Sequence, residues 1–182
     1  MDTFRGLLTR GCSVISTCEE LAWPWLRHPV LAQELHELAV RGNARILGTG
    51  INPGFLMDAL PVAVTSACHE VRALRVERIQ DAAKRRLPFQ EKVGVGLAPA
   101  EFERRVAAGT LRHVGLGESL HFLAHYLGWR VERWEETIAP VLAERALDSG
   151  LGPVAAGHAR GVRQEARGWV GGKLALQFAF QA

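Results

Sequence analysis

The sequence feature that most constrains the fold is the glycine-rich stretch at residues 48–54, GTGINPG, which lies between two apolar segments. Residues 44–47 have the composition of a buried strand, and residues 55–67 are long enough for a helix. Pro53 suits the first turn of that helix. Such a loop can bring backbone amides and the Asn52 side chain against a ligand. The alternative is a structural turn in which Asn52 satisfies its own backbone.

A second strand is expected one helix earlier in the chain. Residues 13–18 have strand composition, and Pro29 opens an amphipathic helix that Gly42 can end. Two strands joined by a helix form the unit of a parallel α/β sheet, whose ligands lie beyond the carboxyl ends of the strands. Glu19 and Glu20 directly follow the first strand, so they and the glycine loop could face one ligand. The alternative for these carboxylates is a solvated acidic cap on the next helix.

The rest of the chain predicts an α+β domain built on an open sheet. One face of its last strand, formed by alternate apolar residues, is expected to be buried. Strands or extended segments are expected at residues 71–80, 88–95, 129–138 and 173–181, and helices at residues 1–10, 99–107 and 118–127. Residues 154–164 form a further segment of unassigned type, followed by a turn around Gly168. The fold class is therefore α/β, with a partial parallel unit followed by a mixed sheet.

Composition narrows the classes of function. The 182 residues are 48% hydrophobic, which is enough for one sizeable core. The net charge is +3, and the arginines are scattered along the sequence, which disfavours nucleic-acid binding. No apolar run approaches the roughly 20 residues of a membrane helix, so no membrane partner is expected. Cys12, Cys18 and Cys68 form no CxxC pair and leave one cysteine over in any disulfide scheme. This favours a reducing compartment, and a cytoplasmic location is expected.

Seven short segments, taken in order, resemble a known family. They are residues 16–21 (STCEEL), 23–24 (WP), 48–58 (GTGINPGFLMD), 78–92 with its QDA, RR and QEK motifs, 113–119 (HVGLGES), 127–129 (LGW) and 135–140. In this order they are similar to the 2,4-diaminopentanoate dehydrogenases and the related native amine dehydrogenases, within the dihydrodipicolinate reductase-like group.

The resemblance implies an amino-terminal Rossmann domain that binds NAD or NADP, followed by a domain for substrate binding and dimerisation. The sequence lacks the G-x-G-x-x-G phosphate fingerprint of the first domain. We therefore expect residues 1–50 to be the carboxyl-terminal remnant of a Rossmann-type parallel sheet and residues 51–182 to be the α+β substrate-binding and dimerisation domain. On this view the chain is a fragment or a truncated gene product. A homodimer is expected through the apolar face of residues 174–180.

The resemblance also implies a reaction, the interconversion of an amine with a ketone plus ammonia by hydride transfer. A carboxylate near the nicotinamide would hold ammonium and move protons, and Glu19 and Glu20 are the catalytic candidates. Successive strand residues face opposite ways, so only one of the two is expected to point inward, and Glu19 is favoured. The other candidate site residues are Thr17, Cys18, Asn52, Pro53 and Gly54 for the cofactor, and Trp23, Phe55, Arg78 and Gln90 for the substrate. Ordinary core packing for Trp23 and Phe55, and a surface salt bridge for Arg78, remain alternatives.

No metal site is expected. His121 and His125 lie four residues apart on an expected helix, but the sequence has no HExxH pattern and no acidic or cysteine cluster at ligand spacing. Two other functions stay open: a binding or oligomerisation module without a cofactor, and an imine reductase of the dihydrodipicolinate reductase type.

Overall fold

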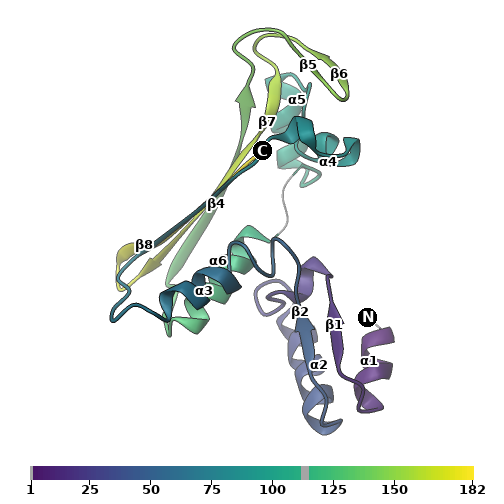
Figure 1. Cartoon of the computed structure of the whole chain (residues 1–182), viewed down its shortest axis with the longest axis vertical. Helices are drawn as coiled ribbons and strands as arrows, with labels where there is room; N and C mark the ends of the chain where they lie inside the picture. Colours follow the sequence, from purple (N-terminus) through teal and green to yellow (C-terminus); the bar gives the residue numbers. More distant parts are fainter. Residues whose placement is uncertain (1, 112–114) are drawn as a thin grey trace. The chain divides into compact units, whose positions relative to one another are not determined.

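The computed structural model describes residues 2–111 and 115–182, and the chain divides into two compact units (Figure 1). The first unit is Met1–Arg72 with Gly115–Val131, and the second is Ala73–Val114 with Glu132–Ala182. Each compact unit thus combines two stretches of sequence, and the limits of the units differ from the predicted boundary after residue 50. The functional assignment of residues 1–50 and 51–182 stays a prediction. His113 and Val114 of the HVGLGES segment lie outside the described residues.

The first unit contains a two-stranded parallel sheet and its helices. Its elements are α1 (Asp2–Thr9), β1 (Val14–Ser16), the short 3-10 helix η1 (Glu19–Leu21), α2 (Pro29–Arg41), β2 (Ile46–Gly48), α3 (Ala59–Thr65) and α6 (Leu116–Tyr126). Strands β1 and β2 run parallel, with Ser16 opposite Gly48. The strand–helix–strand order predicted from the sequence is confirmed.

The core of this unit explains why the two strands lie where they do. Leu8 of α1, Val14 of β1, Leu21 of η1 and Leu35 and Ala39 of α2 form one buried cluster. Leu35 and Ala39 are four residues apart and therefore lie on the same face of the helix. Burying a leucine side chain stabilises the folded state by roughly 1.5–3 kcal/mol, so this cluster holds the helices against the sheet.

The segment after β2 differs from the predicted helix at residues 55–67. Residues 52–58 form turns, and α3 begins only at Ala59. The Asp58 side chain caps this helix, because its Oδ1 accepts a hydrogen bond of 2.7 Å from the backbone N–H of Ala59. Pro53 therefore lies in the turns and not in the first turn of the helix, and its peptide bond with Asn52 is cis.

The second unit is built on a four-stranded mixed sheet of order β3-β8-β7-β4. Its elements are β3 (Leu74–Ile79), the 3-10 helix η2 (Ala82–Lys84), α4 (Leu87–Lys92), α5 (Pro99–Ala107), β4 (Arg133–Leu142), β5 (Leu147–Ser149), β6 (Gly152–Val154), β7 (Ala159–Val170) and β8 (Lys173–Gln181). Strand β3 pairs parallel with β8, and the β8–β7 and β7–β4 pairs are antiparallel. The predicted open mixed sheet is confirmed.

Two local predictions in this unit are wrong. Residues 88–95 were expected to be extended, but Leu87–Lys92 is a helix with Pro88 in its first turn, where proline costs no hydrogen bond. The turn expected around Gly168 lies instead at Gly171 and Gly172, which both have positive φ. Glycine is the residue that adopts such angles readily, so this pair makes the tight turn between β7 and β8.

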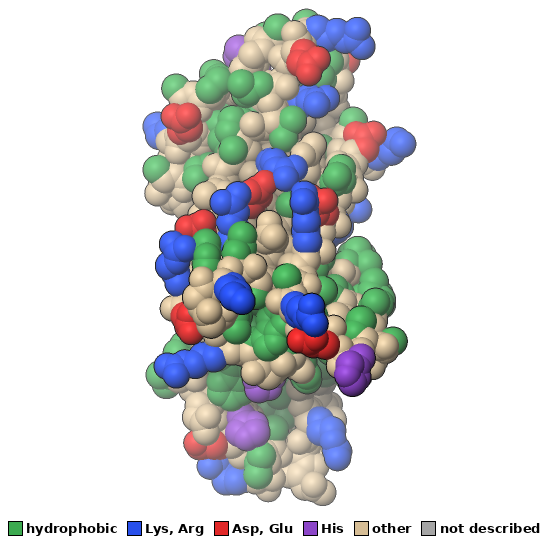
Figure 2. Space-filling view, turned by 90° about the vertical axis from the view of Figure 1, so that its left-hand side faces the viewer, with side chains coloured by type: hydrophobic (Ala, Val, Ile, Leu, Met, Phe, Trp, Pro, Cys, Tyr) green, Lys and Arg blue, Asp and Glu red, His purple; other side chains and the backbone are tan. Residues whose placement is uncertain are grey.

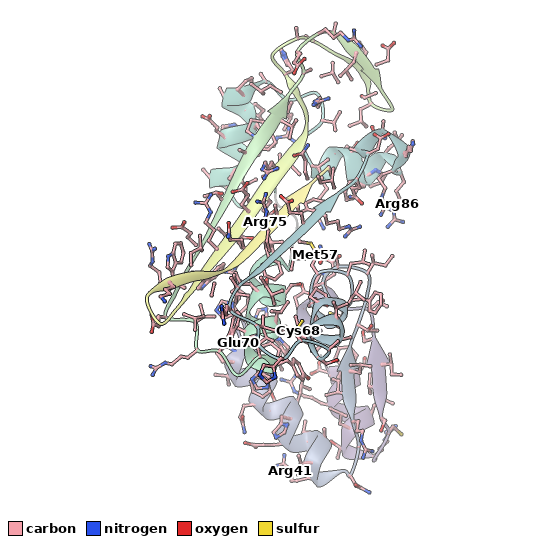
Figure 3. The ribbon with its side chains drawn as sticks, turned by 60° about the vertical axis from the view of Figure 1, so that its left-hand side comes forward. Arg41, Met57, Cys68, Glu70, Arg75 and Arg86 are labelled. Carbon is pink, nitrogen blue, oxygen red and sulfur yellow. The ribbon has the colours of Figure 1, made fainter. Side chains whose placement is uncertain are left out.

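The two faces of the sheet have different chemistry. Leu176, Phe178 and Phe180 of β8 are buried on one face. The other face carries ion pairs, such as Arg163 Nε to Glu165 Oε1 at 2.6 Å, and Arg75 projects from β3 (Figure 3). Lys/Arg and Asp/Glu side chains are interspersed over the side of the molecule drawn in Figure 2. Because the three apolar side chains are already buried in the single chain, they offer no exposed surface for a second copy, and the homodimer stays a prediction.

The three cysteines, all within the described residues, are free thiols. Of the helices that the structure describes, none has both the length and the apolar character needed to cross a bilayer.

Candidate active site

The carboxyl ends of β1 and β2 bring two of the predicted segments to one edge of the sheet. The backbone N–H of Thr49 donates to Ser16 O at 2.9 Å, which continues the pairing past the end of β2. A side chain at Gly48 would collide with the backbone carbonyl of Leu21, so glycine is required where η1 passes the end of β2. The glycine loop and the Glu19–Leu21 turn therefore leave adjacent strands at the same edge, where parallel α/β sheets bind ligands.

The two candidate carboxylates lie in η1 and differ in exposure. Glu19 is half-buried and Glu20 is exposed, and Thr17 just before them is exposed as well. Glu20 Oε2 accepts a hydrogen bond from Cys18 Sγ at 3.2 Å. Burial of the thiol, and next this hydrogen bond, raise the pKa of Cys18. A thiol held protonated is a poor nucleophile, so Cys18 fits a wall of the site better than a reacting group.

The glycine loop at residues 48–54 is held in place by its own close backbone packing, by hydrogen bonds to Asp58 and by packing of Pro53 against Gly115. Gly54 has a φ of 123°, and a Cβ on it would lie 2.5 Å from the backbone N of Gly50, so the loop folds closely on itself. The Gly54 N–H donates to Asp58 Oδ2 at 2.7 Å, and the Ser119 hydroxyl of α6 donates to the same oxygen at 2.8 Å. Gly115 leaves room for the Pro53 ring, which a side chain there would strike.

Asn52 is the most informative residue of this loop. Its side chain is 7% exposed, and within the described residues neither Nδ2 nor Oδ1 has a hydrogen-bond partner. A buried amide without partners costs about 1–3 kcal/mol, so folded proteins seldom keep one without a reason. The alternative in which Asn52 satisfies its own backbone does not hold. An amide offers one donor and one acceptor side by side, which complements another amide.

The apolar candidates divide between packing and exposure. The Trp23 ring contacts two side chains of α6, with centroid distances of 5.7 Å to Phe122 and 4.9 Å to His125. Phe55 is 49% exposed, whereas Met57, labelled in Figure 3, is 1% exposed and belongs to the core. Trp23 therefore has a packing role whether or not it contacts a ligand. Phe55 packs less than Trp23 and is the better placed of these two residues to cover a ligand.

Sequence reasoning missed the residues that support the loop. Asp58 is fully buried and was not singled out, although an aspartate before an apolar run is a helix-start signal. Ser119 gave no signal, because its role depends on a partner 61 residues away. Glu118, also buried, pairs with Arg27 at 3.4 Å, which ties α6 to the segment before α2.

The remaining predicted substrate residues lie in the second unit. Arg78 of β3 donates from Nη2 to Gln80 Oε1 at 3.0 Å and lies over the Phe180 ring at 5.6 Å. Burial, and next the charge of Arg85, lower the pKa of Arg78. Among the described residues Arg78 forms no ion pair, so the surface salt-bridge alternative does not hold. Gln90 of α4 is 2% exposed.

The basic run at residues 84–86 and the two histidines have ordinary surroundings. Lys84, Arg85 and Arg86 are exposed, and Arg86 projects away from the rest of the unit (Figure 3). His121 Nδ1 lies 2.8 Å from Gly117 O, and burial lowers the pKa of His121. No group of three or more metal-binding side chains is found in residues 2–111 and 115–182.

The fold and the sheet edge define an α/β protein with a glycine loop at the carboxyl ends of two parallel strands. Residues 55–181 match the family described as the 2,4-diaminopentanoate dehydrogenase C-terminal domain, and the chain belongs to this family. It is 32% identical over 178 residues to a 2,4-diaminopentanoate dehydrogenase of Acetoanaerobium sticklandii, covering 97% of this chain and 50% of the relative.

A solved structure shows the same fold. The amine dehydrogenase from Mycobacterium smegmatis superimposes with a TM-score of 0.75 at 22% identity, covering 99% of this chain and 53% of that one. The chain thus spans about half the length of each of these two proteins. The family resemblance and the α/β fold expected from the sequence are confirmed.

Proposed function

We propose that the chain forms part of an NAD(P)-dependent amine dehydrogenase that interconverts an amine and a ketone plus ammonia, with an amino acid related to 2,4-diaminopentanoate as substrate. The observation that carries the proposal is the buried, unpartnered amide of Asn52 at the sheet edge where Glu19 and Glu20 also lie. Membership of the dehydrogenase family supports the same reaction.

The residues of the loop fit a nicotinamide. The carboxamide of a nicotinamide carries one acceptor and one donor, which match Nδ2 and Oδ1 of Asn52. Gly54 keeps the backbone beside Asn52 free of side chains, and Pro53, Thr17 and Cys18 would line the same edge. When bound there, the nicotinamide supplies the hydride.

The carboxylates of η1 would handle the protons. In the direction of the amine, ketone, ammonia, hydride and one proton give amine and water. The half-buried Glu19 would hold ammonium, take one proton to release ammonia as the nucleophile, and return a proton to the hydroxyl group that leaves as water. Glu20, whose Oε2 accepts a hydrogen bond from the Cys18 thiol, would stabilise the positive charge of the ammonium from the exposed side. Trp23 and Phe55 would shield the reacting carbon from water.

Cofactor binding tests the proposal first. Adding NADH or NADPH to the purified chain should quench tryptophan fluorescence, because Trp23 and Trp25 follow η1 directly. Asn52→Ala should weaken NADH binding about tenfold or more, since two hydrogen bonds are lost. It should lower the free energy of unfolding by less than about 1 kcal/mol, since no hydrogen bond of the Asn52 side chain within the protein is lost and the cost of burying an unpartnered amide is removed. Unchanged fluorescence at saturating NADH and NADPH would point to a binding or oligomerisation module.

The reaction is tested by following NADH at 340 nm while 2,4-diaminopentanoate is oxidised with NAD or NADP. Glu19→Gln should lower the rate at least about 100-fold, because loss of a general acid–base group lowers a rate by about that factor. Glu20→Gln should lower the rate less, because Glu20 is proposed to support the charge and not to transfer the proton. Glu103→Gln is the matched control, since Glu103 is an exposed glutamate of α5 in the other unit. Turnover of a cyclic imine but not of a ketone with ammonia would instead identify an imine reductase.

A further inference from the structure

Helix α6 contacts the two halves of the candidate site, which lie far apart in the sequence. One half is η1 with its carboxylates and the segment that follows it, and the other is the glycine loop that carries Asn52. All of these elements belong to the first unit, where α6 also lies beside α3 (Figure 1). One helix can therefore hold both halves at a fixed separation.

One face of α6 holds the segment that follows the carboxylates. Glu118 Oε1 lies 3.4 Å from Arg27 Nε in an ion pair. Further along the helix, Phe122 and His125 pack on the Trp23 ring, with centroid distances of 5.7 Å and 4.9 Å. Residues 118, 122 and 125 recur at intervals of four and three, so they share one face of the helix. Because Trp23 comes directly after η1 and its cap, this face fixes where η1 ends.

The neighbouring face of α6 holds the glycine loop. The Ser119 hydroxyl donates to Asp58 Oδ2 at 2.8 Å, and the same oxygen accepts a hydrogen bond of 2.7 Å from the loop backbone. Gly115 lies four residues before Ser119, on the same face, and packs against the Pro53 ring. Pro53 follows Asn52 directly, so this face of α6 fixes the position of the unpartnered amide.

The two polar side chains that make these contacts are consecutive and buried. Glu118 is 6% exposed and Ser119 is 1% exposed. The helix around them is apolar, since Leu116, Leu120 and Leu123 are each 0% exposed. Burying a carboxylate and a hydroxyl lowers stability compared with burying apolar groups of similar size. Core packing alone therefore does not explain why this turn of α6 carries two polar residues.

We infer that Glu118 and Ser119 are positioning residues of the candidate site, a role that rests on the proposed dehydrogenase function. Glu118 acts through Arg27 on the segment that follows η1, and Ser119 acts through Asp58 on the loop that carries the unpartnered amide. Because the two residues share one turn of a helix, they hold the proton-transferring carboxylate and the nicotinamide at a fixed separation. A misplacement of about 1 Å can lower a rate by about 100-fold, so small shifts of α6 matter to the reaction.

Kinetics of the purified chain with 2,4-diaminopentanoate and NAD or NADP separate positioning from stability. Glu118→Gln should lower kcat about tenfold and change the affinity for NADH, measured by tryptophan fluorescence, less than about twofold, because only the carboxylate half moves. Ser119→Ala should also lower kcat about tenfold, and it should weaken NADH binding about threefold, because the loop that carries Asn52 moves. The assays are run at a temperature at which circular dichroism shows every variant to be folded, so that unfolded protein does not contribute to the loss.

NMR of the cofactor-free chain tests the same positions without any reaction. Ser119→Ala should shift the side-chain amide signals of Asn52. Glu118→Gln should shift the indole N–H signal of Trp23 and the carboxyl carbon signal of Glu19. Signals of the second unit should stay unchanged. If the chain neither binds NADH nor turns over the substrate, the proposed function fails, whereas these shifts still decide whether α6 holds the two halves in place.

The matched controls belong to the same unit and remove the same chemical groups. Thr65→Val removes a buried hydroxyl that donates to the Val62 carbonyl at 2.9 Å within α3. Glu37→Gln removes a carboxylate that pairs with Arg41 at 3.6 Å on α2. Both variants should change kcat and the affinity for NADH less than about twofold, because neither group contacts α6 or the site.

Arg27→Met is a second variant of the ion pair, for the case in which Glu118→Gln does not fold. The Arg27 side chain is 38% exposed and tolerates replacement better than the buried carboxylate. In the double variant kcat should fall no further than in the slower single variant, since both changes remove the same contact. The positioning role is overturned if the folded Glu118→Gln and Ser119→Ala variants keep the kcat of the controls. It is equally overturned if their NMR shifts are no larger than those of the controls.

Discussion

Replacing Asp58 with alanine tests how the loop that carries Asn52 is held in place. The Asp58 carboxylate is fully buried and accepts three hydrogen bonds. They come from the backbone N–H of Gly54 at 2.7 Å, the backbone N–H of Ala59 at 2.7 Å and the hydroxyl of Ser119 at 2.8 Å. One side chain therefore closes the loop, caps α3 and joins both to α6.

The expected loss in free energy of unfolding is about 3 kcal/mol. Removing the helix cap at Ala59 costs about 1 kcal/mol. The N–H of Gly54 loses its partner, which costs about 1–3 kcal/mol for a buried donor. The Ser119 hydroxyl adds little, because a serine in a helix can turn to the carbonyl four residues earlier. Against a total stability of roughly 5–15 kcal/mol for a natural protein, this is a large share.

Urea unfolding followed by circular dichroism measures the loss, and amide hydrogen exchange at Gly54 locates it. Asp81→Ala is the matched control, because Asp81 caps η2 with a single bond of 3.0 Å to the Ala83 N–H and its side chain is 54% exposed. That change should cost about 0.5–1 kcal/mol. If Asp58→Ala costs no more than Asp81→Ala, and the exchange rate at Gly54 does not rise, the buried carboxylate does not hold the loop.

Three further outcomes follow from pKa shifts. Cys18 should react with Ellman's reagent more slowly than the two exposed cysteines, and Glu20→Gln should speed the reaction, because this removes one cause of the raised thiol pKa. Burial lowers the pKa of His121, so the unfolded state binds the proton more readily than the folded state. The free energy of unfolding, measured by urea titration, should therefore fall as the pH drops below 6.5, and His121→Gln should abolish this part of the pH dependence. Hydrogen bonds from two arginines of α5 lower the pKa of Glu101 to about 2, so the stability from these bonds is present above pH 4.5 and is lost as the pH falls toward 2. A carboxyl carbon NMR titration of Glu101 with a midpoint near 4.5 would contradict the lowered pKa.

Helices and strands with strong local signals could be predicted from the sequence. Proline at the first turn and an apolar stripe gave α2 from Pro29 and α5 from Pro99. Alternating apolar residues gave β8 at Lys173–Gln181 with both ends correct. These signals suffice because each depends only on residues a few positions apart, through the helical period of 3.6 and the strand period of 2.

The errors lie where distant residues decide the local structure. The start of α3 at Ala59 depends on Asp58, whose carboxylate is shared with Gly54 and Ser119. Residues 88–95 mix apolar and polar residues in a pattern that fits a strand or a short helix, and Pro88 is compatible with both.

The candidate site was predictable only as a location. The order of strands placed Glu19, Glu20 and the glycine loop at one edge, and the family resemblance supplied the chemistry. The unpartnered state of Asn52 could not be read from the sequence, because it depends on what the rest of the fold leaves unsatisfied. The orientation of the Gln80 amide likewise depends on which of its atoms Arg78 contacts.

The pairing of β3 with β8 determines the order in which the second unit can assemble during synthesis. In the sheet of described strands β3 has β8 as its single neighbour, and Leu74 aligns with Leu176 across about a hundred residues of intervening chain. The pairing cannot begin before β8 has been synthesised, and closing so long a loop is slow, since contacts between distant residues form slowly. The ribosome must therefore release β8 before β3 can pair, and until then β3 is an unpaired strand of the kind through which folding intermediates aggregate.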